Sequence, residues 1–434
     1  MRTTFSPTQL ADPVLREAND IVRKCVHCGF CLATCPTYLL LGDERDSPRG
    51  RIYVVKELLE NDAPATAGVV RPLDRCRTCL SCTTTCPSGV DYAHLIGRAR
   101  VYVERGHARP LPDRLLRRML GMIVPRPWLL RVGMLAGRAL RPLRMLVPGR
   151  LKGMVSMAAD RVAMPSSVDR PQVFPAEGER RMRVALLSGC AQRVLRPQIN
   201  EATIRVLRRH GCEVVVAKGA GCCGALDHQL GREDAARVAA RANVRAWSAL
   251  RVAGPLDAVV FNASGCGVSL KDYGHLLRDD AAWAQPAAEI ASLAHDVSEI
   301  LLDLGLKPAA IATGQRVAYH LACTMQHGLG LRAEAKRLLS DAGFIVAEPA
   351  EPHVCCGSAG LYAILEPDLA GRLRQRKVAN IEATEPQIIA SDNIGCITHL
   401  AAATAVPVVH TAELLDWATG GPKPAALASI LRGL

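Results

Sequence analysis

The chain of 434 residues is poor in aromatic side chains, which make up only 4% of it, although 49% of its residues are hydrophobic. It has no run of eighteen apolar residues without charges, so no segment is expected to span a membrane by itself. Residues Met1–Leu10 also lack the apolar core of a secretory signal peptide. We therefore expect a cytoplasmic protein, long enough for two or three domains.

Acidic residues are missing from one long segment. Between Arg114 and Ala159 there is no Asp or Glu, whereas ten Arg or Lys residues occur there, in a chain of net charge +13. Leu, Met and Trp are interleaved with these cations, a mixture typical of amphipathic helices at a bilayer interface. The alternatives are an acidic partner subunit, or a connector that packs its apolar face on its own protein. Nothing in it is typical of a nucleic-acid-binding module, so no nucleic-acid partner is expected.

Cysteine, in contrast, is abundant, and eight of the seventeen cysteines form two copies of the run C-x2-C-x2-C-x3-C-P. The first run is Cys25, Cys28, Cys31, Cys35 and Pro36, and the second, fifty-one residues later, is Cys76, Cys79, Cys82, Cys86 and Pro87. Two-residue gaps let successive sulfurs face one centre, and the fourth cysteine of each such run ligates the other cluster. The spacing therefore predicts two [4Fe–4S] clusters. The cluster-1 set is Cys25, Cys28, Cys31 and Cys86, and the cluster-2 set is Cys76, Cys79, Cys82 and Cys35.

Zinc binding and disulfide formation fit these cysteines less well. Zinc sites usually group cysteines as separated pairs with a long spacer, whereas these are tight quartets that end in proline. Disulfides belong to oxidising compartments, which the missing signal peptide disfavours. The two quartets indicate that the protein transfers electrons.

From Arg183 onward, short β-rich runs alternate with helical periods, which is typical of βαβ units with a parallel sheet. We expect strands at Val184–Ser188, Val214–Ala217 and Ala258–Asn262, and helices at Asn200–Arg209 and Arg232–Val252. The fold class is thus α+β overall, with a mostly helical two-cluster ferredoxin domain followed by a duplicated α/β parallel-sheet domain. The expected domains are residues 1–105 (helical, two clusters), 106–182 (basic amphipathic connector), 183–310 (first repeat) and 311–434 (second repeat).

The two repeats carry cysteines at corresponding positions. Cys190, Cys222 and Cys223 recur 133 residues later as Cys323, Cys355 and Cys356, and Cys266 recurs 130 residues later as Cys396. Loops at the carboxyl ends of parallel strands converge on one crevice, so the four thiols of each repeat can meet. The first CCG site comprises Cys190, Cys222, Cys223 and Cys266, and the second CCG site comprises Cys323, Cys355, Cys356 and Cys396. We predict a redox or metal-cluster site at each, rather than eight inert buried thiols.

Three weaker signals surround these sites. Gly219-Ala-Gly-Cys-Cys-Gly224 matches a dinucleotide-binding fingerprint, but the second repeat lacks two of its glycines and no acidic residue follows at ribose-binding distance. Cys212 corresponds to Ile345 and is interpreted as packing. His320, His327 and His399 adjoin the second CCG site, where the first repeat has Leu187, Val194 and Ser269. We interpret them as polar packing, with a ligand or a donor to a ligand as the alternative.

The paired quartets and the two Cys…Cys-Cys-Gly…Cys repeats resemble the iron–sulfur subunit of bacterial glycolate oxidase over essentially the whole chain. The most specific strings are Cys25-Val-His-Cys-Gly-Phe-Cys-Leu-Ala-Thr-Cys-Pro-Thr-Tyr38, Asp46-Ser-Pro-Arg-Gly-Arg-Ile-Tyr53, Leu321-Ala-Cys-Thr-Met-Gln-His327 and Cys355-Cys-Gly-Ser-Ala-Gly360. The architecture is also similar to cysteine-rich subunits of heterodisulfide reductase, of anaerobic glycerol-3-phosphate dehydrogenase and of lactate-utilisation complexes.

The resemblance implies a subunit of a glycolate dehydrogenase complex, in which a partner flavin (FAD) subunit oxidises glycolate to glyoxylate. This chain would pass the electrons to a quinone or another acceptor, peripherally at the inner face of the membrane, and no catalytic residue is assigned to it. In some relatives a cysteine-rich repeat holds a further iron–sulfur cluster with a terminal C-x-x-C. Here those positions are Cys266-Gly-Val-Ser269 and Cys396-Ile-Thr-His399, so each site has four cysteines rather than five. The alternatives are a thiol–disulfide subunit like that of heterodisulfide reductase, or a lactate or glycerol-3-phosphate dehydrogenase subunit.

Overall fold

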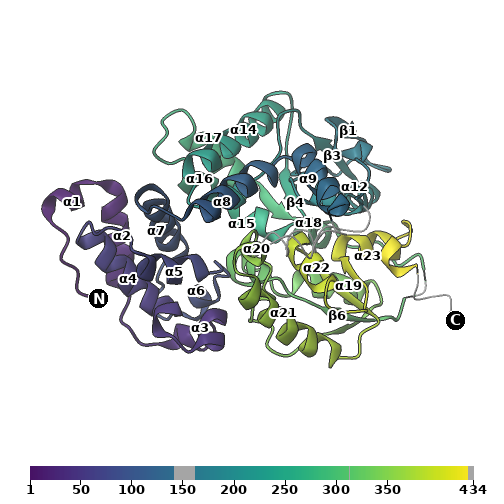
Figure 1. Ribbon diagram of the computed structural model, residues 1–434. Helices are drawn as coiled ribbons and strands as arrows, with labels where there is room; N and C mark the ends of the chain where they lie inside the picture. The colour runs from purple at the N-terminus through teal and green to yellow at the C-terminus, as the bar shows by residue number, and fades with distance from the viewer. Residues whose placement is uncertain (141–161, 312, 429–434) are drawn as a thin grey trace.

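The computed structural model describes residues 1–140, 162–311 and 313–428. A helical lobe at the N-terminal end lies beside two α/β units, each built on its own sheet (Figure 1). The predicted fold class, a helical region followed by a duplicated α/β region with parallel sheets, is confirmed.

The helical lobe is built around the two cysteine quartets. Its helices are α1 (Pro7–Ala11), α2 (Pro13–Lys24), α3 (Pro36–Leu41), α4 (Pro48–Glu60), α5 (Ala67–Arg75), α6 (Ser81–Thr85) and α7 (Tyr92–Gly106). Proline stands at the first position of α2, α3 and α4, where the missing N–H costs no intrahelical hydrogen bond. Val22, Val55, Leu73 and Leu95 fill the core between α2, α4, α5 and α7. The two cysteine loops pack against this core, which fixes their position.

The first sheet has the order β1-β3-β2-β4-β5. Its strands are β1 (Gln172–Phe174), β2 (Met182–Leu186), β3 (Cys212–Val216), β4 (Ala258–Phe261) and β5 (Ala294–Asp296). The main helices of this unit are α11 (Gln192–Leu195), α12 (Gln198–Arg209), α13 (Ala225–Gln229), α14 (Glu233–Val252), α15 (Ser264–Lys271), α16 (Tyr273–Leu276), α17 (Ala284–Ser292) and α18 (Val297–Leu304). The strands β2 to β5 are parallel to one another.

The second sheet has the order β7-β6-β8-β9 and is parallel throughout. Its strands are β6 (Arg316–Tyr319), β7 (Ile345–Ala347), β8 (Ile388–Ser391) and β9 (Val408–His410). Its helices are the π-helix η5 (Thr324–Leu329), α19 (Glu334–Asp341), α20 (Tyr362–Leu365), α21 (Pro367–Glu382), α22 (Ile394–Ala401) and α23 (Thr411–Ala418). The order 7-6-8-9 reproduces 3-2-4-5 of the first sheet, so the duplication seen in the sequence is a duplication of topology.

The expected linker before the first repeat contributes a strand that the sequence did not reveal. Gln172–Phe174 pairs with β3 and runs antiparallel to it, at the edge of the first sheet. Three residues are too few to show a period, and this segment is polar and rich in proline. The second sheet has no counterpart of β1 among the described residues.

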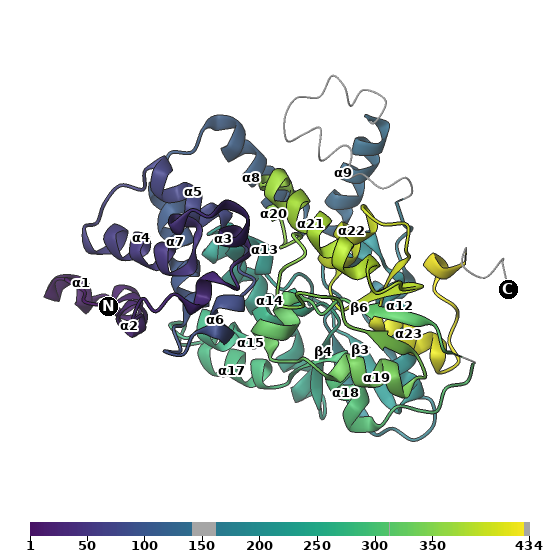
Figure 2. The same cartoon turned by 90° about the horizontal axis from the view of Figure 1, so that it is seen from below.

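In its described part before residue 141, the basic connector forms the helices α8 (Leu111–Ile123) and α9 (Pro127–Ala139). Leu116 and Leu120 of α8 are buried against Leu230 of the first repeat and Leu361 and Leu365 of the second. Helices α8 and α20 accordingly lie side by side (Figure 2). For α8, the alternative of an apolar face packed on its own protein is therefore the correct one.

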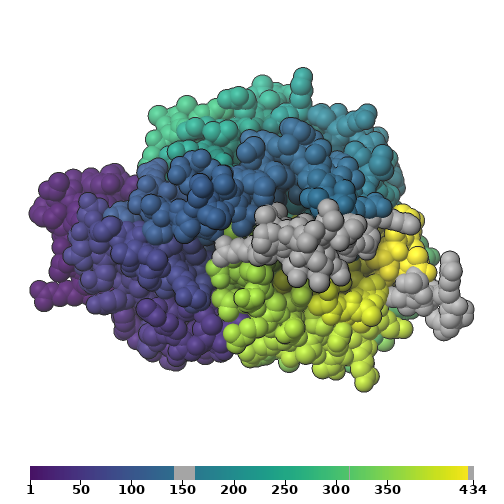
Figure 3. Space-filling model, in the orientation of Figure 1, coloured from purple at the N-terminus to yellow at the C-terminus, as the bar shows by residue number. Residues whose placement is uncertain are grey.

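Helix α9 differs from α8 because none of its side chains is buried. Trp128, Val132 and Leu135 are exposed at a spacing that places them on one face of the helix. The connector lies on the surface of the molecule (blue in Figure 3). The remaining basic residues of this segment, Arg141 and Arg144 among them, lie outside the described residues. No helix of the described part is long and apolar enough to cross a membrane.

Candidate metal centres

The two ferredoxin-type loops have the same local backbone. Each follows the end of a helix, α2 or α5, and each contains two residues of positive φ at matching places. These are His27 (56°) and Gly29 (87°) in the first loop, and Thr78 (50°) and Leu80 (63°) in the second. Left-handed residues are uncommon outside glycine, so their recurrence at an offset of fifty-one residues indicates a required backbone path. The alternating turns bring successive cysteines to one side of the loop.

The cluster-1 set lines a hollow of about 420 Å³ near the surface. All four of its cysteines border the hollow, together with apolar groups from Pro48, Ile52 and Val90. Cys28 is exposed, and its neighbours Val26 and Phe30 are 66% and 63% exposed. This site therefore opens to the outside of the molecule.

The cluster-2 set lines a second hollow of about 310 Å³ in the interior. Its four cysteines are all buried. The hollow is also bordered by Pro36, Leu80, Arg51 and Arg77. The structure thus brings together the same two groups of four that the cysteine spacing indicated, one at the surface and one enclosed.

Buried cations lie beside the cluster-2 set. The side chain of Arg51 is 1% exposed and donates hydrogen bonds to the Pro72 carbonyl (2.7 Å) and the Thr37 hydroxyl (2.9 Å). It also forms an ion pair with Asp46 (3.2 Å), and its Nη1 lies 3.8 Å from Cys35 Sγ. A Cβ on Gly50 would collide with the Glu44 carbonyl oxygen, so glycine is required where α4 passes this turn. The residues of the string Asp46–Tyr53 therefore support the cluster-2 set.

The electrostatics favour thiolate at one cysteine of this site, Cys76, whereas burial raises the pKa of Cys79 and Cys82. Burial raises the pKa of Cys76, but Arg51 and Arg100 outweigh it, so the pKa is lowered overall. Four sulfurs around one hollow, with an arginine on its wall, fit a [4Fe–4S] cluster at each of the two sites. Such a cluster, when bound, supplies one-electron transfer, with a potential that depends on hydrogen bonds to sulfur and on burial. Tyr92 is one such donor, since its hydroxyl lies 3.5 Å from Cys76 Sγ.

The second CCG site is assembled from three loops at the carboxyl end of the second sheet. Cys323 follows β6, Cys355 and Cys356 follow β7, and Cys396 lies in the first turn of α22. Cys323 Sγ lies 3.7 Å from Cys355 Sγ, and Cys356 Sγ lies 3.4 Å from Cys396 Sγ. Gly357 has a φ of 108°, and a Cβ there would meet the Ala370 carbonyl oxygen. Glycine therefore lets the chain turn back towards α21.

The first CCG site has the same plan. Cys190 follows β2, Cys222 and Cys223 follow β3, and Cys266 begins α15. Hydrogen bonding by Cys190 and then by Cys223 lowers the pKa of Cys222, just as Cys323 and Cys356 lower the pKa of Cys355. Each site therefore favours the thiolate form of the first cysteine of its adjacent pair, and the second site also favours it at Cys396, where Cys356 and His320 lower the pKa to about 5. Both groups of four predicted thiols do come together.

The surroundings of the two CCG sites differ. At the first site the backbone carbonyls of the adjacent pair are bonded by neutral groups, with Asn243 donating to the Cys222 carbonyl (2.9 Å) and Tyr273 donating to the Cys223 carbonyl (2.9 Å), and the nearby buried Asp227 adds an acidic group. Gly224 approaches Ala236 as Gly357 approaches Ala370, so α14 and α21 correspond at an offset of 134 residues. At that offset Lys377 takes the place of Asn243. The ammonium of Lys377 is buried near Cys355 and Cys356 and donates to the Glu351 carbonyl (2.6 Å).

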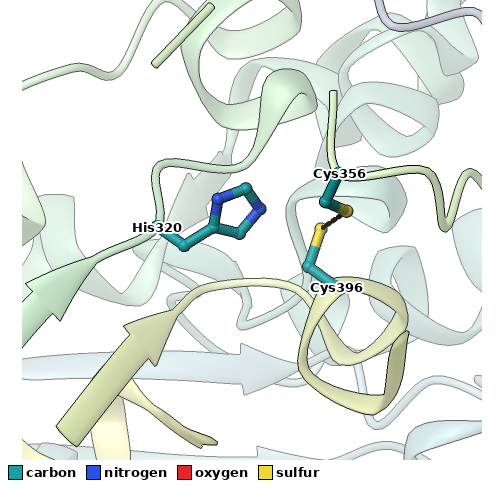
Figure 4. Close-up of side chains that lie close together, drawn as sticks. All are labelled: His320, Cys356 and Cys396. Carbon is teal, nitrogen blue, oxygen red and sulfur yellow. Dashed lines mark hydrogen bonds between the residues drawn. The ribbon is translucent and has the colours of Figure 1, made fainter. Parts of the chain in front are cut away.

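The three histidines increase this difference. Burial lowers the pKa of His327 and of His399, to about 4 in each case, so both rings are neutral. His327 Nδ1 lies 2.7 Å from the Thr84 hydroxyl, and His399 Nε2 lies 3.3 Å from the Ala370 carbonyl. These two histidines therefore fit our interpretation from the sequence, which was polar packing. His320 points instead towards Cys356 and Cys396 (Figure 4).

The second CCG site adjoins the cluster-2 set. Arg77, which follows Cys76, is 4% exposed and lies with its guanidinium over the Tyr362 ring, 4.0 Å from the ring centroid. Burial opposes its charge, yet the Cys355 thiolate beside it raises its pKa. Cys79 is close enough to Cys355 and to Cys323 for their charges to influence one another. Among the described residues, none of the guanidinium nitrogens of Arg77 has a well-formed hydrogen-bond partner.

Sequence reasoning did not find Arg77, Tyr362 or Lys377. The sequence held one signal for Arg77. The corresponding residue of the first quartet is Val26, so only the second quartet has a cation between its first two cysteines. Tyr362 and Lys377 carry no local signal, since their roles depend on how the second repeat packs on the helical lobe.

Comparison with known proteins agrees with this architecture. Residues 21–90 match a family model described as a 4Fe-4S dicluster domain, and residues 184–271 and 317–401 each match a model described as a cysteine-rich domain. A hypothetical protein from Helicobacter pylori shares the fold, with a TM-score of 0.54, 9% identity, and coverage of 98% of this chain and 75% of that one.

Named relatives cover the chain from end to end. The glycolate oxidase iron-sulfur subunit of Escherichia coli (strain K12) is 43% identical over 96% of this chain and 99% of its own length. The probable glycolate oxidase iron-sulfur subunit of Bacillus subtilis (strain 168) is 32% identical over 91% and 94%. Lactate utilization protein A of Oceanobacillus iheyensis is 26% identical over 54% of this chain and 97% of its own. The chain belongs to the family of glycolate oxidase iron–sulfur subunits, and the predicted oxidoreductase component with iron–sulfur clusters is thereby confirmed.

Proposed function

We propose that this chain is the electron-transferring subunit of a complex that oxidises glycolate to glyoxylate on a partner flavin subunit. Two full-length relatives bear the name of such a subunit, which supports glycolate as the donor. The described residues contain a ferredoxin-type lobe with two groups of four cysteines, suited to one-electron steps between a two-electron flavin and an acceptor. The cysteines of the cluster-1 and cluster-2 sets are the residues that we propose as ligands.

The observation that carries this proposal is the serial arrangement of three cysteine sites. The cluster-1 set opens to the surface, where Val26 and Phe30 form an exposed apolar rim suited to a partner subunit. The cluster-2 set is enclosed behind it and shares the lining residues Cys82, Pro48 and Tyr92 with the first hollow. The second CCG site follows, with Arg77 and Cys79 beside Cys355. We propose that electrons enter or leave at the cluster-1 rim and that the second CCG site is the inner terminus.

The side chains of this chain have definite tasks in that arrangement. Arg51 and Arg77 balance the negative charge of thiolates in a dry interior, where an unbalanced charge would be costly. Pro48, Ile52 and Leu80 exclude water from the hollows. Thr84 and His327 join the loop of the cluster-2 set to η5 and so fix its distance from the second CCG site.

The quinone acceptor and a peripheral position at the inner face of the membrane are further parts of the proposal. Helix α9 supports them, because Trp128, Val132 and Leu135 form an exposed apolar face on a helix that also carries Arg126, Arg131 and Arg138. Such a face fits the interface of an anionic bilayer. The full chain is expected to sediment with vesicles of phosphatidylglycerol, and the variant Trp128→Gln/Leu135→Gln is expected to stay in solution. Equal sedimentation of both proteins would rule out α9 as the contact.

Cys79→Ser tests the relay itself. In the complete complex we expect lower iron content and loss of acceptor-linked glycolate oxidation, while glycolate still reduces the partner flavin. Cys212→Ser is the matched control, because Cys212 is the first residue of β3, at the end of the sheet opposite to the loops that carry the CCG cysteines. Full acceptor-linked oxidation in Cys79→Ser would overturn the assignment. With lactate as the only effective donor, the relay would stand and the donor would be corrected.

Close sulfur pairs favour one alternative, thiol–disulfide chemistry at the CCG sites. The 3.4 Å and 3.7 Å Sγ–Sγ separations would allow disulfides to form after small movements. Reduction of a disulfide substrate by the isolated, reduced chain would support this alternative, whereas dependence on the flavin partner supports the relay.

A further inference from the structure

The side chain of His320 lies at the second CCG site. The residue follows the last residue of β6 directly, and its backbone N–H donates to the Ala390 carbonyl of β8 (2.8 Å). This bond continues the pairing of the two strands and fixes the residue at the carboxyl edge of the sheet. The ring is therefore carried by the most rigid part of the repeat.

A ring nitrogen of His320 and the sulfurs of Cys356 and Cys396 all lie within 4.8 Å of one another, and all three residues are buried (Figure 4). The Nε2 atom of His320 is enclosed and has no well-formed hydrogen-bond partner among the described residues. Cys356 and then the His320 ring lower the pKa of the Cys396 thiol, so the ring and this sulfur already attract each other. An enclosed polar nitrogen without a partner is unfavourable, so its position needs an explanation. A metal bound to the two sulfurs would provide one, since imidazole and thiolate are both ligands of iron.

The other two histidines also have one enclosed ring nitrogen without a partner among the described residues, but neither lies in a group with two cysteine sulfurs as His320 does. His327 is directed to Thr84 and His399 to the Ala370 carbonyl. In the first repeat the place of His320 is taken by Leu187, which cannot ligate a metal. The second site also lacks the fifth cysteine that a terminal C-x-x-C would supply, so it has room for a ligand of another kind.

We propose that His320 is a direct ligand of an iron–sulfur centre at the second CCG site, which makes this a mixed nitrogen–sulfur site and leaves the first site with sulfur ligands alone. The proposal rests on the proposed function, since it identifies a ligand at the inner terminus of the electron path. No bond to iron is made or broken during electron transfer. The nitrogen ligand replaces one anionic thiolate by a neutral donor, which favours the reduced state.

The test uses the full chain, purified without oxygen, with histidine labelled by ¹⁵N. Pulsed electron paramagnetic resonance of the reduced protein should show strong coupling between a histidine ¹⁵N and a paramagnetic iron centre. His320→Leu introduces the residue of the first repeat and should abolish the coupling. His399→Ser, matched in the same way to Ser269, should retain it. His320→Cys keeps a ligand and should retain the iron while losing the coupling.

Absence of a histidine coupling in the unmodified chain, or its persistence in His320→Leu, would overturn the proposal. Iron content separates this failure from that of the proposed function. If Cys396→Ser loses iron but no histidine coupling exists, only the ligand is wrong. If Cys396→Ser loses no iron, zinc or no metal occupies the site and the inner terminus of the path is wrong as well.

Discussion

The two cysteine-rich repeats have the same strand order and the same four cysteines, but only one of them adjoins the ferredoxin-type lobe through its cysteines. The second CCG site has Arg77, Lys377 and His320 around it, whereas the first has the acidic Asp227 near Cys222, with Asn243 in place of Lys377 and Leu187 in place of His320. Duplication therefore preserved the geometry of the thiols while their electrostatic environment diverged. Four cysteines in a fixed arrangement therefore do not determine the redox role of a site, because buried charges and neighbouring cysteine sites also influence that role.

The largest expected effect separates the two sites directly. Cys356→Ser should reduce acceptor-linked glycolate oxidation roughly 100-fold, because it removes a sulfur from the site next to the cluster-2 set. The matched change Cys223→Ser in the first repeat should reduce it less than about threefold. Steady-state assays of the complete complex, with flavin and iron content measured in each variant, check this. Equal losses would mean that both repeats take part in the same path.

The next effect concerns the cation between two sites. Arg77→Val introduces the residue of the first quartet and should slow electron transfer about tenfold, because a buried positive charge beside Cys355 is lost. Stopped-flow reduction of the iron–sulfur absorbance by glycolate measures it. Arg77→Lys keeps the charge without the planar group over Tyr362 and should be intermediate. If Arg77→Val transfers electrons at the wild-type rate, the closeness of the cluster-2 set and the second CCG site is enough for transfer, and the charge of Arg77 is not needed.

A smaller change is expected at Lys377. Lys377→Asn gives the second site the amide of the first, and removal of a nearby positive charge should make the second site harder to reduce. We expect its midpoint potential to fall by roughly 60 mV, which is tenfold in a one-electron equilibrium. Redox titration followed by electron paramagnetic resonance gives the value. The reciprocal Asn243→Lys should raise the potential of any centre in the first site and leave the second unchanged.

The smallest effect lies at the contact between the helical lobe and the first repeat, which is made by ion pairs. His94 lies between Asp91 (2.6 Å) and Asp272 (2.9 Å). Burial lowers the pKa of His94, but these two carboxylates raise it by more, so that the pKa is about 10. The ordinary value of 6.5 applies to the unfolded chain. The stabilisation from His94 is therefore complete below pH 6.5 and is lost as the pH rises to about 10.

Thermal unfolding of His94→Gln measures this contribution. The variant should unfold at a lower temperature than the wild type at pH 6, and the two curves should converge by pH 10. Thr84→Val removes the hydroxyl that contacts His327, at the junction with the second repeat, and should show no such pH dependence above pH 7, because His327 is neutral there. A gap that stays constant with pH would show that His94 acts by packing alone.

Much of the fold and of the site could be predicted from the sequence. The cysteine spacing indicated which sulfurs meet, because ligand geometry restricts spacing, and the constant offset indicated the duplication. Strand β1 was missed because three residues, two of them exposed, carry no period. The roles of Arg77 and Lys377 could not be predicted, since each depends on packing between segments far apart in the chain. His320 could be named, but its direction could not, because Leu187 shows only that the position tolerates an apolar side chain.

The position of Arg77 against Cys355 and Tyr362 also has a consequence for biogenesis. During synthesis the N-terminal lobe emerges first and folds first. Arg77, which borders the cluster-2 hollow, reaches its place beside Cys355 and under Tyr362 only when residues more than two hundred positions later have folded against it. We therefore expect the side of this hollow at Arg77 to be more accessible to a carrier of iron and sulfide before the second repeat folds. Cluster insertion is accordingly expected before final closure, so that the order of maturation follows the order of the chain.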